Sequence, residues 1–279
     1  MSIRIVTDSS CDLPQGVVDA HGISVVPLSI RFGEQEYIDR EQLTTAEFWA
    51  KCATSATLPE TAAPAPGQFE QVYRSLAAEG ATGIVVVSLS GALSATMQSA
   101  ELAARSVTDV VPVRVVDSRS VTLGVGTMAI ACAQRAAAGG TLDEVAALAT
   151  DLAARTKVFG ALDTLENLKK GGRIGGAQAM LGSMLSIKPI IDITGGKVEQ
   201  EAKQRTRSKS LRYLAEKVGA QPGIENLAVM HGDAPDVEEM LDLLAPHFPR
   251  EKIVVGDLGA VIGAHGGPRT MGVTFQLSS

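Results

Sequence analysis

The first half of the chain alternates short, nearly continuous apolar runs rich in β-branched residues with stretches of helical periodicity. Such runs are typical of strands that are buried on both faces of a parallel sheet. We place these strands at residues 3–7, 25–32, 83–87 and 113–116. Thr44 with Glu47, and Thr141 with Glu144, form capping-box patterns that predict a helix after each threonine. The alternation predicts an α/β fold whose first domain contains a mainly parallel sheet.

The pattern changes after Arg155, and we expect a second domain to begin there. Residues 187–193, the turn Thr-Gly-Gly-Lys and the residues that follow predict a hairpin, which favours antiparallel pairing. Further strands are expected at 158–162, 227–231, 253–255 and 271–275, and an amphipathic helix at Ala177, Met180, Leu181, Met184 and Leu185. Residues 58–67 contain three prolines and predict an irregular loop. The predicted domains are 1–155 and 156–279, with a mixed or antiparallel sheet and helices in the second and a ligand site between them.

Composition argues against several classes of protein. The formal net charge is −6 and aromatic residues make up 4% of the chain, so neither broad attraction to nucleic acid nor a base-stacking surface is expected. Cys11, Cys52 and Cys132 are widely spaced and have no histidine at ligand spacing, which predicts reduced thiols, no metal site and no cofactor. No apolar run reaches the roughly 18 residues of a membrane span. We therefore expect a cytoplasmic protein without stable membrane insertion.

The segment 162–174 combines two lysines, two glycines and an arginine. Gly171 and Gly172 allow a ligand to approach the main chain, and the fork of Arg173 matches a carboxylate or phosphate. The alternative is a helix that ends at Lys170 with a glycine cap and basic residues at its negative end. The segment is a candidate anion site with both interpretations open.

Two further segments carry hydroxyl and carboxyl groups after predicted strands. Residues 88–96 contain four hydroxyl side chains, so Ser94 is a candidate anion ligand, or else a helix cap shared with Ser90. Ser94 as a nucleophile is the weaker hypothesis, because the sequence around it lacks the G-x-S-x-G elbow. Asp8 ends the first strand, where ligand sites of α/β proteins cluster, and we favour a structural role for it.

His265 is the histidine with an unusual setting, because three glycines and a proline surround it in the segment 262–268. These glycines would let a ligand reach the imidazole ring, although a lone histidine is often structural. Lys203, Arg205 and Arg207 alternate in sequence and would share one side of a strand. They are a candidate docking surface, with a solvated charged face as the alternative.

Several of these segments, taken in their order along the chain, resemble the DegV family. The segments are 7–10, 93–96, 163–166 leading into 169–174, 187–190 and 262–268. The resemblance spans nearly the whole chain. It implies a two-domain bacterial α/β protein, not itself an enzyme, that holds one long-chain fatty acid between its domains and presents it to a fatty acid kinase subunit in phospholipid metabolism.

The same resemblance implies four residues at the fatty acid carboxylate. Thr61 and Ser94 would hold the carboxylate, and Arg173 and His265 would stand nearby. Departures from the family pattern are also visible: Ala62 and Ala63 replace polar residues beside Thr61, Ala95 replaces a glycine, and Arg269 stands at a usual glycine. Arg269 would either add a carboxylate partner or narrow the portal.

The flexible side chains of Met180, Met184, Met230 and Met271 suit an apolar tunnel, with ordinary core packing as the alternative. The rival function is an enzyme, a serine hydrolase or phosphotransferase that uses Ser94 with His265, or Asp8 as acceptor. The chain has no G-x-x-x-x-G-K-[ST] run, which argues against nucleotide chemistry of that type.

Overall fold

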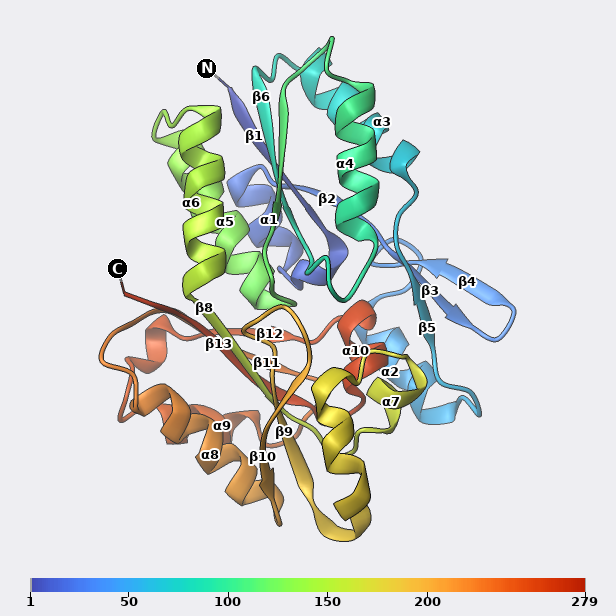
Figure 1. Ribbon diagram of the computed structural model, residues 1–279, viewed down its shortest axis with the longest axis vertical. Coiled ribbons are helices and arrows are strands. Elements are labelled where there is room, and N and C mark those ends of the chain that lie inside the picture. The colour runs from blue at the N-terminus through green and yellow to red at the C-terminus, as the bar shows by residue number, and fades with distance from the viewer. Residues whose placement is uncertain (1, 279) are drawn as a thin grey trace.

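Three β-sheets organise the part of the chain that the computed structural model describes, which is residues 2–278, with the side chains of 182–186 outside the description (Figure 1). The first sheet is parallel, in the order β2-β1-β6-β7, and its strands are β1 (Ile3–Asp8), β2 (Ser24–Val26), β6 (Gly83–Ser88) and β7 (Val113–Asp117). The second is mixed, in the order β10-β9-β8-β13-β11-β12, and its strands are β8 (Thr156–Ala161), β9 (Lys188–Asp192), β10 (Glu199–Gln204), β11 (Ile224–His231), β12 (Val254–Asp257) and β13 (Met271–Leu277). A small antiparallel sheet, β4-β3-β5, contains β3 (Ser29–Phe32), β4 (Gln35–Ile38) and β5 (Glu60–Ala62). The predicted α/β fold, with a parallel first sheet and a mixed second sheet, is confirmed.

Helices cover these sheets. The α-helices are α1 (Gln15–His21), α2 (Thr45–Thr54), α3 (Pro66–Ala78), α4 (Thr96–Ser106), α5 (Leu123–Ala137), α6 (Leu142–Arg155), α7 (Glu166–Lys170), α8 (Arg207–Gly219), α9 (Val237–Leu244) and α10 (Ala260–Gly266). Short 3₁₀ helices are η1 (Ser9–Cys11), η2 (Gly175–Ser186) and η3 (Arg250–Lys252). The two predicted capping boxes are confirmed at the starts of α2 and α6. Among residues 2–278, no helix combines the length and the apolar composition that crossing a membrane requires.

The parallel sheet is buried on both faces. All six residues of β6 are buried, as the continuous apolar run of a central parallel strand predicts. α3 and α4 cover one face, where Phe69 and Tyr73 pack on the sheet, and α5 and α6 cover the other face (Figure 1). This arrangement brings the carboxyl ends of β1, β6 and β7 to the edge that faces the second sheet.

The mixed sheet uses its two faces differently. α8 and α9 cover one face, where Phe159 and Phe275 lie in a core cluster of their own. Val158 and Ile191 lie on the opposite face. They pack in a core cluster that also includes residues from the first half of the chain. The space between the two halves is therefore bounded by this second face.

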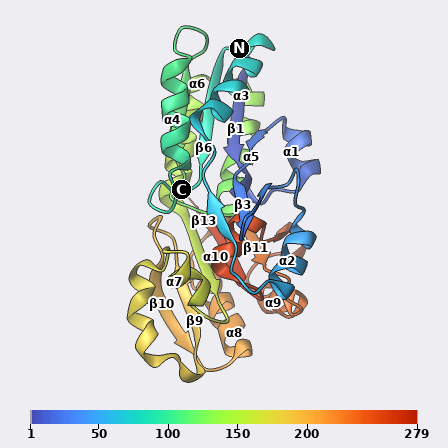
Figure 2. The same ribbon diagram turned by 90° about the vertical axis from the view of Figure 1, so that its right-hand side faces the viewer.

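A segment of the first half packs on the second half. The small sheet and α2 lie beside α10 (Figure 2). Trp49 Nε1 of α2 donates to the Leu258 carbonyl at 3.2 Å, and a Cβ on Gly263 would lie 2.8 Å from the Trp49 ring. Close contact with aromatic rings therefore requires glycine at this position of α10.

The start of α10 is held by a carboxyl group from the end of η1. Gly259, the N-cap of α10, has no side chain, and the Asp12 carboxyl lies against it and accepts from its backbone N–H. Burial is the main reason that the pKa of Asp12 is raised from 3.8 to about 8. Asp12 thus joins the end of η1 to the helix that carries His265.

One strand prediction and one loop prediction were wrong in detail. Residues 25–32 do not form one strand, because β2 ends at Val26 and β3 begins at Ser29 in a different sheet. Pro27 lies between them and has no N–H for a sheet ladder. Residues 58–67 are not an irregular loop, since they contain the edge strand β5 and the first two residues of α3, which begins at Pro66.

The second half follows the predictions more closely. The expected hairpin is confirmed as β9 paired with β10. The expected amphipathic α-helix at 177–185 is instead the 3₁₀ helix η2. Met184 and Leu185, which were also predicted on this helix, have side chains outside the described part of the structure.

Asp12→Asn tests whether burial of this carboxyl makes the fold sensitive to pH. Between pH 3.8 and about 8 the folded state holds a proton that the unfolded state has lost, so stability should fall as the pH rises through this window. We expect this part of the pH dependence to be absent in Asp12→Asn. Urea unfolding of both proteins at several pH values measures it, and parallel curves of unfolding free energy against pH would contradict the prediction.

Candidate ligand-binding site

An apolar cavity of about 830 Å³, including its open mouth, lies between the two halves of the chain. One wall comes from β8, β9 and the residue that follows β9, and it includes Val158, Gly160, Ile191 and Ile193. The opposite wall contains residues that follow β6 and β7, among them Leu89 and Val121. Leu258 and Ile262 of the α10 segment complete the lining. A partly open, mostly apolar cavity with a few polar groups is the usual form of a small-molecule site.

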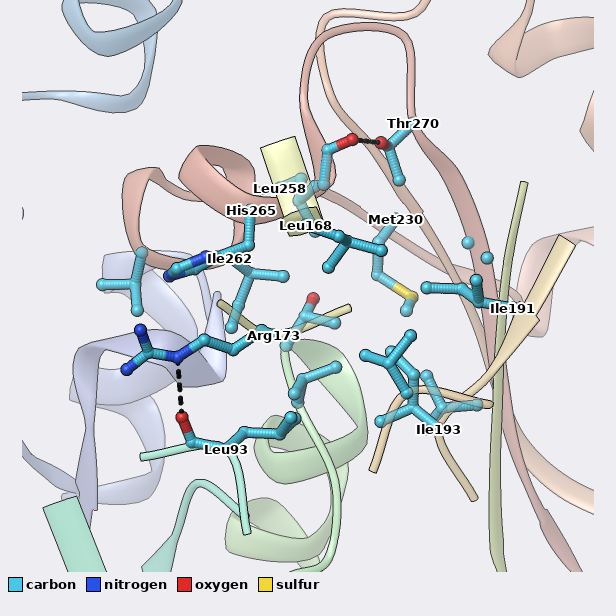
Figure 3. A pocket seen from close by; sticks show the side chains of 18 of the residues that line it. Leu93, Leu168, Arg173, Ile191, Ile193, Met230, Leu258, Ile262, His265 and Thr270 are labelled. Atoms are coloured by element: carbon cyan, nitrogen blue, oxygen red, sulfur yellow. Dashed lines mark hydrogen bonds between the residues drawn. The ribbon is translucent and has the colours of Figure 1, made fainter. Parts of the chain in front are cut away.

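The four residues predicted for an anion line this one cavity: Thr61, Ser94, Arg173 and His265. They come from β5, the loop before α4, the segment after α7, and the last turn of α10. Figure 3 shows Arg173 and His265 on one side of the cavity, with Met230, Ile191 and Ile193 on the other. The cavity therefore has a polar end and a largely apolar remainder.

Thr61 and His265 are directly hydrogen-bonded. The distance between Thr61 Oγ1 and His265 Nε2 is 2.9 Å, although the two residues are 204 positions apart in sequence. Gly171 packs against the His265 ring on the side of Nδ1, and a Cβ on Gly171 would overlap that atom. The absence of a side chain at Gly171 is thus needed for His265 to reach Thr61.

His265 is neutral near pH 7. Burial is the larger cause and the charge of Arg173 the smaller one, and together they lower the pKa of His265 from 6.5 to about 4. Nδ1 is buried and has no hydrogen-bond partner within the described part of the chain. A neutral imidazole has one donor and one acceptor, so its Nε2–H can donate to Thr61 Oγ1 and leave the Thr61 proton for a ligand, without adding a charge.

Arg173 carries the positive charge of the site. Its Nε donates to the Leu93 carbonyl at 3.2 Å, as drawn in Figure 3, and its Nη1 donates to the Gly171 carbonyl at 2.7 Å. These two carbonyl groups orient the guanidinium. No acidic side chain among residues 2–278 pairs with Arg173. The site therefore offers a cation that an anionic ligand can neutralise.

The structure has the helix end that the alternative interpretation of the segment 162–174 predicted. α7 ends at Lys170 with Gly171 as its C-cap, and Gly172 adopts a left-handed φ of 70°. This turn reverses the chain so that the Arg173 N–H bonds the Leu168 carbonyl at 2.9 Å. The helix end is what places the arginine at the cavity.

Ser94 contacts the first turn of α4 and not the histidine. Its Oγ lies 2.9 Å from Thr96 Oγ1 and accepts from the Thr96 N–H at 3.3 Å. Ser94 therefore satisfies one of the free N–H groups at the start of α4, as a helix cap does. A hydrolase would need a hydrogen bond between the serine and its base. Here the hydrogen-bonded partner of the His265 ring is Thr61. The geometry favours binding over nucleophilic chemistry.

Asp8 has a structural role in this fold. Its side chain is 1% exposed and accepts from the Leu89 N–H at 2.8 Å and the Ser10 N–H at 3.1 Å. These bonds tie the end of β1 to the end of β6. A carboxylate enclosed in this way is not accessible as a phosphoryl acceptor.

The basic series at 203–207 does not share one face of a strand, because β10 ends at Gln204 and α8 begins at Arg207. Arg205 is exposed. Arg207 is mostly buried and forms a bidentate pair with Asp236 at 2.7 and 2.9 Å. The two arginines therefore differ in their availability to a partner.

Arg269 lies outside the cavity lining. It adopts a left-handed φ of 62°, which is the conformation that glycine favours, and its Nε lies 3.3 Å from Asp163 Oδ2. Asp163 also binds Lys188 at 2.9 Å. The positive φ explains physically why glycine suits this position.

The methionine hypothesis holds for one of the three methionines whose side chains are described. Met230 lines the cavity, whereas Met180 and Met271 are fully buried in core clusters.

Sequence reasoning missed Thr122 and Thr270 in the lining. The alternation of Gly272 with the buried, apolar residues of β13 was the available signal for the cavity face of that strand. No group of three or more His, Cys, Asp and Glu residues is arranged to hold a metal ion in the part of the chain described here.

Comparisons with known proteins identify relatives over the whole chain. The model of the DegV family, described as an uncharacterised protein family, matches residues 2–277. A DegV domain-containing protein of Streptomyces coelicolor is 39% identical over 280 residues, covering 98% of each chain. Another from Deinococcus radiodurans is 34% identical over 282 residues, covering 99% of each chain.

Solved structures agree with this result. A DegV family protein from Thermus thermophilus, described with fatty acid binding, superimposes with a TM-score of 0.91 at 36% identity and covers 100% of both chains. DegV from Bacillus subtilis, described as a fatty acid binding protein, gives a TM-score of 0.87 at 26% identity over 100% of both chains. A DegV family protein from Ruminococcus gnavus, solved with vaccenic acid, gives 0.86 at 25% identity, covering 98% of this chain and 99% of that one.

The titration of His265 tests the electrostatics of the polar end. In lipid-free protein we expect the ring to stay neutral down to a pKa of about 4, and Arg173→Gln to raise this pKa. The variant pKa should remain below 6.5, because burial is the larger cause of the shift. Carbon-detected NMR of the histidine rings measures both. A wild-type pKa near 6.5 would contradict this account of the site.

Proposed function

The chain belongs to the DegV family, and we propose that it binds a long-chain fatty acid in this cavity and presents the carboxylate to a partner fatty acid kinase. Relatives that cover the whole chain and are described as fatty acid binding support the first part. In this proposal the protein is a carrier and not itself an enzyme. Its three cysteines are free thiols, which supports a place in the reducing cytoplasm.

The observation that carries the proposal is the division of one cavity into a polar end and an apolar remainder. A fatty acid has the same division. A 16-carbon acid would bury about 14 methylenes, and at about 0.8 kcal/mol each the gross gain is about 11 kcal/mol. Association opposes this with a cost of at least about 4 kcal/mol. Burial of the tail is therefore sufficient for tight binding even with a modest contribution from the carboxylate.

The polar end suits a carboxylate that has to be handed on. The hydroxyls of Thr61 and Ser94 would donate to its oxygens, and Arg173 would supply the compensating charge. His265 is neutral near pH 7, and its Nε2–H would donate to Thr61 Oγ1, which leaves the Thr61 proton free for the carboxylate without adding a second cation. A carboxylate held mainly by neutral donors keeps more of its reactivity than one in a tight buried ion pair.

Docking of the kinase is assigned to the exposed surface around Arg205, with Arg207 beside it. Arg205 is exposed at the junction of β10 and α8. Arg207 is bound to Asp236 and would act through the shape of this junction more than through free charge. Charge complementarity at such a rim mainly affects the rate of association.

Ser94→Ala and Thr61→Val test the carboxylate assignment. Each removes one hydrogen bond to a charged group, worth about 1.5–3 kcal/mol, so each should weaken palmitate binding about tenfold or more. Displacement of a fluorescent fatty acid measures the change, and thermal unfolding checks the fold. Thr150→Val and Ser75→Ala make the same chemical changes at exposed positions of α6 and α3 and should bind like wild type. Wild-type affinity in both site variants would rule out this assignment.

Arg205→Glu tests the docking assignment separately. We expect it to raise the concentration of carrier needed for half-maximal acyl phosphate formation by a fatty acid kinase, while palmitate binding stays unchanged. Arg105→Glu makes the same charge reversal at an exposed position of α4 and serves as the control. Equal kinase kinetics for the two variants would show that Arg205 does not contribute to docking.

A further inference from the structure

Two glycines lie opposite each other on neighbouring strands in the wall of the cavity. Gly160 of β8 and Gly272 of β13 are partners in the antiparallel ladder, and both line the cavity. Glycine weakens the interior of a strand, and there it often marks the close approach of a ligand. Neither residue has a positive φ, so the backbone would accept alanine at both positions. The reason for glycine in this pair, which we call the glycine pair, is therefore space and not backbone conformation.

Larger side chains flank the glycine pair in the same row of the sheet. The ladder places Ile191 of β9 opposite Gly160 and Met230 of β11 opposite Gly272, and residues opposite each other share a face of the sheet. Adjacent strands are about 4.8 Å apart, so the backbones of Ile191 and Met230 are about 14 Å apart with only the glycine pair between them. All four residues line the cavity. The row therefore forms a depression in the sheet between Ile191 and Met230.

The cavity reaches the backbone of the sheet at this depression. Phe159 contributes to the lining although its side chain packs in the core cluster on the opposite face, so its main chain faces the cavity. A Cβ on Gly160 would lie 3.5 Å from Ile191 Cγ1, which is an ordinary contact, and a Cβ on Gly272 would lie 3.1 Å from Met230 Cε. A methyl group at Gly160 would thus fit without a clash and would take its volume from the cavity. At Gly272 the end of the Met230 side chain would have to move.

The depression lies away from the polar end of the cavity. Figure 3 shows Met230 and Ile191 on the side opposite Arg173 and His265. A carboxylate at the polar end therefore places the distal methylenes of its chain, and not the proximal ones, at the glycine pair. The side chain of Met230 is flexible and can adjust to the end of the chain.

We propose that the glycine pair and Met230 determine which acyl chain lengths the cavity accepts. Gly160 and Gly272 provide the depth in which the distal methylenes lie, and the Met230 side chain limits how far the chain extends. This inference rests on the proposed fatty acid function and names the part of the site that selects among fatty acids.

Gly160→Ala tests the depth of the depression. Displacement of a fluorescent fatty acid measures the affinities of laurate, myristate, palmitate, stearate and arachidate for wild type and variant. The added methyl group should weaken stearate binding about tenfold and laurate binding by less than about twofold, because only the longer chain reaches the glycine pair. Gly67→Ala adds the same group in α3, where nothing lies within 4 Å of the new Cβ, and should keep the wild-type profile.

Met230→Ala tests the limit on chain extension in the opposite direction. Truncation of this side chain enlarges the cavity, so the affinity for arachidate relative to palmitate should rise about tenfold, the gain from burying about two further methylenes. Met240→Ala truncates a methionine of α9 in the core cluster on the other face of the mixed sheet. This control should lower stability and leave the affinity ratio unchanged. Thermal unfolding checks that each variant is folded, and either site variant that folds is sufficient for the test.

Two results would overturn the inference while leaving the proposed function intact. One is that the folded site variants bind the whole series with the wild-type profile. The other is that they change all the affinities by the same factor, as expected if the glycine pair and Met230 contribute only to packing. If no acid of the series binds to folded wild-type protein, the proposed function fails together with this inference.

Discussion

The packing of α10 between the two halves of the chain is the constraint on which the site depends. Groups from three distant segments fix this short helix: Asp12 at its N-cap Gly259, Trp49 at the Leu258 carbonyl, and Asn167 at the Ala264 carbonyl. A helix of seven residues is too short to be stable alone, so these tertiary contacts define its position. Its last turn brings His265 to Thr61, and its inner face forms part of the cavity wall.

The electrostatics of the site depend on Arg173 and on the burial of His265. Arg173 has no acidic partner among the described residues, and burial beside this cation keeps His265 neutral. The described residues therefore give the site one positive charge in apolar surroundings, where an uncompensated charge is unfavourable. A bound carboxylate would supply the missing negative charge and, by the same coupling, favour protonation of His265. Charge complementarity and tail burial thus act at opposite ends of one ligand.

Local features of the sequence predicted much of this fold. The elements that depend on contacts between distant segments were not predicted. The buried strands β1 and β6, the capping boxes of α2 and α6, and the β9–β10 hairpin depend on neighbouring residues and were predicted correctly. Strand β5 was missed because its identity as an edge strand depends on pairing with β3, which no local pattern encodes. The four predicted site residues came from resemblance to a family, and the sequence alone could not have shown that Thr61 lies 2.9 Å from His265. Thr122 and Thr270 were missed, since a threonine on a cavity wall is recognisable only when its surroundings are known.

The most direct test of the central claim is to compare native and denaturing mass spectra of the purified protein and to identify whatever an organic solvent extracts from it. The account predicts one long-chain fatty acid per chain, released on denaturation, or stoichiometric uptake of palmitate or oleate by protein that is purified empty. Folded protein that contains no fatty acid and takes up neither acid would contradict the account.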